Sequence, residues 1–166
     1  MQFILITLRL IHIAAGAFWV GNALMIALVL LPGVRKGGPG GERALPMAQI
    51  SQAMSLASLL TTVSGLLLYW LVSRFAWGWI ASPFGIGFTI GSLAGLAAFL
   101  LGLFSTGPTA KKLAALGGQI QAAGAPPLPA QMAELSRLQA KLTTSSTWGT
   151  ILATAALALM AVARYA

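Results

Sequence analysis

Charged residues are absent from four long stretches of the chain, and this pattern predicts its class. The stretches cover residues 10–34, 44–73, 75–110 and 142–163, and nearly every charge lies between them. A helix needs about 20 predominantly apolar residues to cross the hydrocarbon core of a bilayer, and each stretch is long enough. We therefore predict an all-α, polytopic membrane protein whose four transmembrane helices form a bundle.

Helix-breaking residues between the stretches give approximate limits for these helices. Pro32 should end the first span, and Pro108, which follows a glycine, should stop or kink the third. We expect one membrane domain over residues 1–166, with spans at residues 3–31, 47–72, 85–104 and 147–164.

The longest polar region, residues 109–146, lies between the third and fourth spans. Leucines and other apolar residues recur at helical spacing on both sides of a proline-rich break at residues 124–129. Two arrangements fit this pattern. The region forms a separate short helical hairpin, or the third and fourth helices continue out of the membrane and meet at the proline turn.

The composition agrees with a membrane protein and excludes several other classes. The chain is 58% hydrophobic and only 7% charged, against about 25% charged residues in soluble domains. Its net charge of +8 comes from cations dispersed among the connections, so we expect no nucleic-acid partner and instead an attraction to anionic lipid headgroups. The absence of cysteine excludes disulfides, thiolate metal sites and cysteine nucleophiles.

The distribution of lysine and arginine predicts the orientation. The first and third connections hold seven of these cations: Arg35, Lys36, Arg43, Lys111, Lys112, Arg137 and Lys141. The opposite side holds only Arg9, Arg74 and Arg164. Cytoplasmic loops carry the excess of Lys and Arg, so we expect a bacterial inner membrane protein with both termini outside and the polar helices in the cytoplasm.

Small residues recur every three or four positions along the later helices, and such rows allow close helix packing in lipid. The clearest is Gly87, Gly91 and Gly95 in the third span. These rows should face the bundle interior or a neighbouring subunit, and the glycine row predicts a homo-oligomer or contact with other membrane subunits. An alternative is that the row leaves a groove for a flat cofactor or a lipid.

His12 is the only histidine, and it lies within the first span. An ionisable side chain at that depth is costly and indicates a function. Arg9, Gly16 and Trp19 share its helix face, and Asn22 lies further round. A neutral imidazole can ligate haem iron or copper, so we predict a cofactor site at these five residues, with His12 as metal ligand and haem b as the leading cofactor. The alternative is a hydrogen bond from His12 to a serine or threonine of another helix.

Residues 12–21 read His-Ile-Ala-Ala-Gly-Ala-Phe-Trp-Val-Gly and follow Leu-Arg-Leu-Ile. This segment resembles the first helix of the CopD-like membrane family, in which tryptophan follows the histidine by seven residues and glycine follows two later. It is also similar to the opening of HemJ-type protoporphyrinogen oxidases. The resemblance implies copper handling or haem-linked oxidation, and it extends to His12, Trp19 and Gly21.

Aspartate and glutamate are absent from all four expected spans. Ion-coupled transport usually needs such a carboxylate, and His12 has no acidic partner that would make it a catalytic base. We therefore expect no hydrolytic or phosphoryl-transfer activity, and the sequence does not decide whether the protein is an enzyme. Three classes remain: a haem-binding redox protein, a non-catalytic subunit of a membrane complex and, last, a transporter of a small solute or metal.

Overall fold

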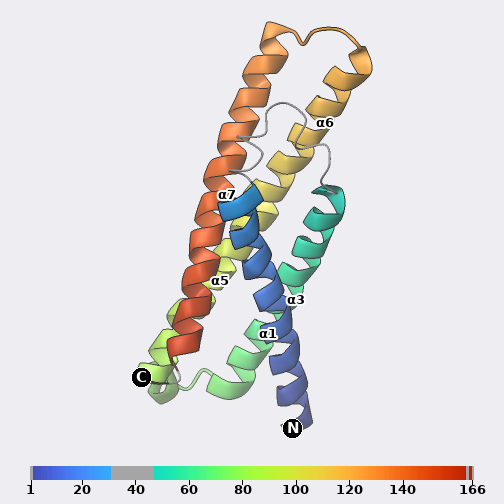
Figure 1. Cartoon of the computed structure of the whole chain (residues 1–166). Coiled ribbons are helices and arrows are strands. Elements are labelled where there is room, and N and C mark those ends of the chain that lie inside the picture. Colours follow the sequence, from blue (N-terminus) through green and yellow to red (C-terminus); the bar gives the residue numbers. More distant parts are fainter. Residues whose placement is uncertain (1, 31–46, 164, 166) are drawn as a thin grey trace.

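The computed structural model describes residues 2–30, 47–163 and 165, and in them it forms an all-helical bundle (Figure 1). Its elements, in chain order, are α1 (Gln2–Met25), the π-helix η1 (Ile26–Leu30), α3 (Met47–Ser73), α4 (Trp77–Ile80), α5 (Pro83–Leu101), the π-helix η3 (Gly102–Thr106), α6 (Gly107–Ala123) and α7 (Pro129–Ala163). The first connection lies outside the described residues, as does Arg164.

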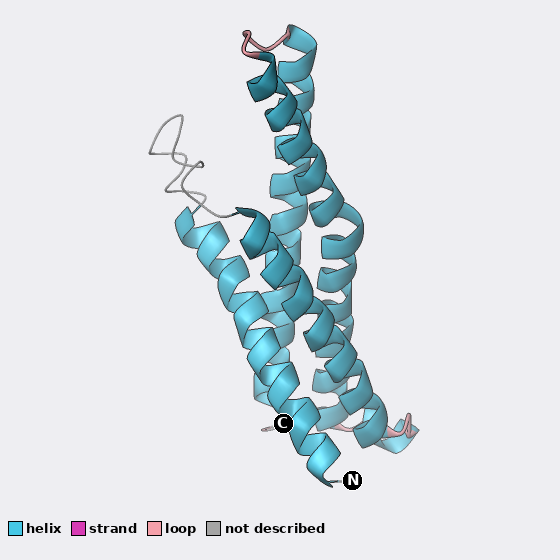
Figure 2. Cartoon of the chain, turned by 90° about the vertical axis from the view of Figure 1, so that its right-hand side faces the viewer, coloured by secondary structure: helices cyan, strands magenta, loops and turns pink. Residues whose placement is uncertain are grey.

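Within the described residues, four continuous helices are long and apolar enough to cross a membrane, which confirms the predicted number of long apolar helices and the all-α class there. They cover Gln2–Val29, Gln49–Ser73, Pro83–Ala123 and Pro129–Ala163. α1 packs mainly against α3, and α5 packs mainly against α7, with weaker contacts between the two pairs (Figure 2). α1 begins and α7 ends at the same end of the bundle (Figure 1).

The third long helix passes through the point at which we expected it to stop or kink. Pro108 has no backbone N–H, so it cannot complete the α-helical ladder. The chain forms the wider turn η3 just before it, in which the Gly107 N–H donates to the carbonyl of Gly102, and then continues as α6. α6 ends at Gly124, whose φ of 60° is left-handed and suits glycine.

The polar region is therefore not a separate hairpin. Of the two arrangements left open by the sequence, the structure has the second: α5–η3–α6 and α7 are continuous helices that meet at the proline turn. The third helix extends beyond the expected residue 104, and the fourth begins at Pro129 instead of residue 147. Both extend past the ends of α1 and α3 (Figures 1 and 2).

The glycine row of α5 packs against α7 of the same chain. A Cβ added to Gly87 would lie 2.8 Å from the Cβ of Ala163, and one added to Gly91 would lie 3.0 Å from the Cγ of Met160. At Gly95 the corresponding distance to the Cβ of Ala156 is 3.7 Å. The row is thus used for close packing inside the chain, and the prediction that it contacts another subunit is not supported.

Few side chains are buried, and those in the centre are small. Val20, Ala98 and Ala153 form the core cluster, while large side chains on the periphery remain exposed, among them Phe3 at 79% and Leu93 at 62%. Soluble proteins rarely expose this much apolar surface to water, so the arrangement suggests contact with a lipid bilayer.

Candidate functional site

The side chain of His12, a residue of α1, faces α3 and is half-buried. Its Nδ1 is 2.9 Å from the backbone carbonyl oxygen of Thr61. A carbonyl can only accept, so Nδ1 carries the hydrogen and donates it. In the neutral ring this fixes the tautomer and leaves Nε2 with a lone pair. No hydrogen bond links Nε2 to another residue in the described part of the chain. The Oγ of Ser64 also approaches Nδ1, at 3.4 Å.

Two glycines make room for this arrangement. A Cβ on Gly65 would lie 2.7 Å from the Cε1 of His12 and 3.1 Å from its Nδ1, so the imidazole occupies the space that a side chain would need. One turn along α1, a Cβ on Gly16 would lie 3.3 Å from the Cγ2 of Thr61. The space at Gly16 is therefore filled by Thr61, and it is Gly65 that lies directly against the imidazole.

The other predicted site residues do not converge on His12. Asn22 donates from Nδ2 to the carbonyl of Phe18, 2.8 Å away in its own helix. Trp19 packs against the core cluster of Val20, Ala98 and Ala153. The side chain of Arg9 is exposed one turn before His12. Of the five predicted residues, only His12 and Gly16 face the same part of α3.

The alternative expected from the sequence, a hydrogen bond from His12 to a serine or threonine of another helix, is confirmed by Thr61 and Ser64 of α3. The shorter contact uses the main-chain carbonyl of Thr61, and a backbone group leaves no sequence signal of its own. Gly65 did carry a signal, because it belongs to a row of small residues on α3, but nothing in the sequence assigned it to His12.

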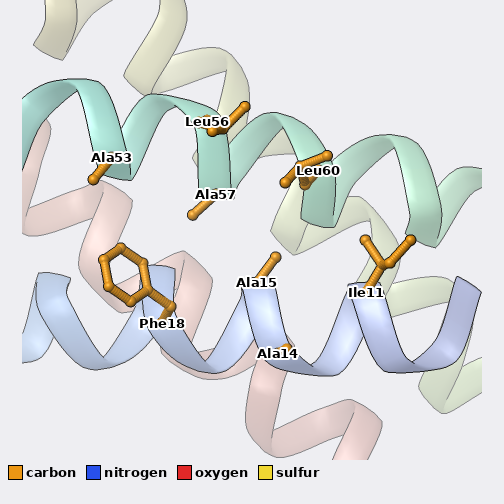
Figure 3. Close-up of a pocket in the computed structure, with 8 residues that line it drawn as sticks. All are labelled: Ile11, Ala14, Ala15, Phe18, Ala53, Leu56, Ala57 and Leu60. Carbon is orange, nitrogen blue, oxygen red and sulfur yellow. The ribbon is translucent and has the colours of Figure 1, made fainter. Parts of the chain in front are cut away.

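An apolar groove lies beside this site on the α1–α3 pair. It has a volume of about 380 Å³ and is lined by Ile11, Ala14, Ala15, Phe18, Ala53, Leu56, Ala57 and Leu60. Figure 3 shows that Ala15 and Phe18 of α1 face the alanines of α3 across it. His12 is not part of its lining. The groove offers apolar contact and contributes no polar ligand.

The described residues offer His12 no cluster of side chains that could hold a metal ion with it. No group of three or more His, Cys, Asp or Glu side chains comes together within the described residues. A copper or zinc site built from several side chains is therefore not supported there. The geometry permits one nitrogen ligand, as in singly ligated haem.

Comparison with known proteins finds no matching family model, no significantly similar curated protein and no significantly similar solved structure. The geometry around His12 is thus the main basis for a functional conclusion.

Proposed function

We propose that this chain is an integral membrane protein that holds haem b through Nε2 of His12. The observation that carries the proposal is the hydrogen bond from Nδ1 to the carbonyl of Thr61, 2.9 Å away. Histidines that ligate metals usually donate their other ring N–H in this way, which fixes the tautomer and makes the free nitrogen more basic. Nε2, which bonds to no other described residue, would be the ligand to the iron.

The surrounding residues fit a single axial ligand. Gly65 and Gly16 let the imidazole lie between the helices, and the carbonyl of Thr61 holds its orientation. The exposed guanidinium of Arg9, one turn away, is available for an ionised propionate. Haem bound there would supply one-electron redox chemistry. Any further protein ligand to the iron would be a methionine or tyrosine or would come from another protomer, because the chain has one histidine.

The resemblance of residues 12–21 to CopD-like and HemJ-type proteins supports this proposal over that segment. Two departures limit how far it extends. The chain lacks a cluster of methionine and histidine suited to copper import, and it lacks a lysine in a later membrane span, on which the oxidase family relies. We therefore propose haem binding and electron transfer without a specific substrate.

For orientation, we propose the bacterial inner membrane with both termini outside and the polar ends of α6 and α7 in the cytoplasm. The supporting observations are the excess of Lys and Arg in the first and third connections and the position of both chain ends at one end of the bundle. Labelling of single cysteines introduced at residues 2 and 125 of intact cells would test this. A membrane-impermeant reagent should modify residue 2 and not residue 125.

The test of haem binding is an absorption spectrum of the full chain purified in detergent from cells supplied with a haem precursor. We expect a Soret band that disappears in His12→Ala. Thr7→Ala is a matched control, since it removes a hydroxyl from the same helix whose bond, to the carbonyl of Phe3, is local. A colourless wild-type protein that also fails to bind added haem would refute the proposal.

The second candidate is a non-catalytic subunit of a larger membrane complex. The observation that favours it is the same hydrogen bond, because a bond between α1 and α3 is a sufficient structural reason for a histidine in this position. Under this reading the protein is colourless, His12→Ala loosens the α1–α3 pair, and wild-type protein co-purifies with partners. No observation favours the transporter.

A further inference from the structure

A second hollow lies on the α5–α7 pair, away from His12. It has a volume of about 410 Å³ and is lined by Leu101, Ser105, Lys141, Thr144, Ser145 and Trp148. The surface of the hollow itself is almost wholly apolar, like that of the groove between α1 and α3. The residues that line it differ from those of the groove, because four of the six also carry an ammonium or a hydroxyl group.

Two of the hydroxyls in this hollow are free to donate. The Oγ of Ser145 is already engaged, since it accepts from Thr106 at 3.2 Å and donates to a carbonyl of its own helix. Ser105 and Thr144 make no hydrogen bond to any other residue that the structure describes. The π-helix η3 contains both Ser105 and Thr106, and its wider turn allows these neighbours to face α7 together. π-Turns of this kind occur frequently at functional sites.

The ammonium group of Lys141 is exposed and forms no ion pair with the described residues. The carboxylate of Glu134, two turns away on α7, is instead bound at 2.7 Å by Arg137. The residues around the hollow thus carry a positive charge and two free hydroxyls, and no carboxylate lies among them. These are the groups that bind an anion with several oxygens, such as a phosphate.

The position of the hollow along α7 indicates where the anion comes from. Lys141 is the last charged residue before the uncharged stretch 142–163, and Trp148 lies about 10 Å further along the helix. The indole is 57% exposed, and tryptophan is enriched at the boundary between headgroups and hydrocarbon. Polar donors therefore lie on the aqueous side of this boundary and apolar contacts on the lipid side.

We infer that this hollow binds the headgroup of an anionic phospholipid. The ammonium of Lys141 and the hydroxyls of Ser105 and Thr144 would donate to phosphate oxygens, while Leu101 and Trp148 would contact the start of an acyl chain. The inference rests on the membrane embedding proposed above and is independent of haem at His12. The apolar wall distinguishes it from a site for free phosphate.

The test is a titration of the purified full chain with phosphatidylglycerol, phosphatidylcholine or inorganic phosphate, with bound molecules counted by native mass spectrometry. We expect tighter binding of phosphatidylglycerol than of the other two. Lys141→Gln should weaken that binding about fivefold, the effect of one cation at a membrane surface. Lys111→Gln is the matched control: it removes one exposed charge from α6 and leaves the hollow intact, so its effect should stay within about twofold.

Three results would overturn the inference: equal binding of the two lipids, equal effects of the two lysine variants, or inorganic phosphate that binds as tightly as phosphatidylglycerol. The double variant Ser105→Ala/Thr144→Val provides a second measurement. It should weaken the binding of phosphatidylglycerol without changing the net charge of the protein. His12→Ala should keep its lipid affinity. Failure of the haem proposal and failure of this one are therefore distinguishable.

Discussion

Replacing Gly65 by alanine would place a methyl group in the space that the His12 imidazole occupies. The added Cβ would lie 2.7 Å from Cε1 and 3.1 Å from Nδ1, too close for the ring to stay in place. Overpacking of this kind costs about 1–3 kcal/mol. Loss of the bond to Thr61 adds about 0.6 kcal/mol, the average for such bonds in membranes. In the opposite direction, alanine has a helix propensity about 1 kcal/mol more favourable than that of glycine. We expect a net destabilisation of about 0.6–2.6 kcal/mol.

Gly149→Ala is the matched control, because this glycine also lies within a long helix and a Cβ there would meet nothing within 4 Å. It should be neutral or stabilising by up to about 1 kcal/mol. Both variants would be compared with the wild type by reversible unfolding of detergent-solubilised protein in denaturant, with helix content followed by circular dichroism.

The decisive comparison uses His12→Ala as a background. The three atoms nearest to the added Cβ all belong to His12, so the clash disappears with the imidazole. Gly65→Ala should then change sign and stabilise the protein by up to about 1 kcal/mol. If it destabilised both backgrounds equally, the placement of the ring against Gly65 would be refuted, and with it the orientation on which ligation through Nε2 depends.

Three further predictions concern other parts of the fold. Gly91→Leu should separate α5 from α7 and lower stability by more than about 2 kcal/mol, measured by the same unfolding assay. Tyr69→Phe removes the 2.7 Å hydrogen bond to Thr89 that joins α3 to α5, and it should cost about 0.6 kcal/mol. The hydrogen bond from Arg137 lowers the pKa of Glu134 below its ordinary value of 4.5. The pair therefore stabilises this part of α7 above pH 4.5, and the effect is lost as the pH falls through the lowered pKa of Glu134. In Arg137→Gln, proton titration by NMR should show an ordinary pKa for Glu134.

The number of long helices could be predicted from the sequence because uncharged length is a direct physical requirement for crossing hydrocarbon. The helix ends were less predictable. Pro108 predicts a break in the helix from local sequence alone, yet one wider turn accommodates it, and the chain continues as helix in contact with α7. Local propensity does not contain that contribution from the neighbouring helix.

The candidate site was predictable only in part. His12 and Gly16 lie four residues apart, so they necessarily share a helix face, and the structure turns that face toward α3. Asn22 lies ten residues from His12, which rotates it about 80° away. Its amide then bonds to its own helix. The spacing of residues on one helix gives no information about which groups of a second helix will meet them.

Each long helix has its principal neighbour next to it in the chain: α1 with α3, and α5 with α7. The main packing surfaces are therefore completed in the order of synthesis, and the first pair can assemble while the second is still in the ribosome. Late defects in α7 should leave that earlier unit intact. We therefore expect the two helix pairs to assemble one after the other and then to join through the weaker contacts between them.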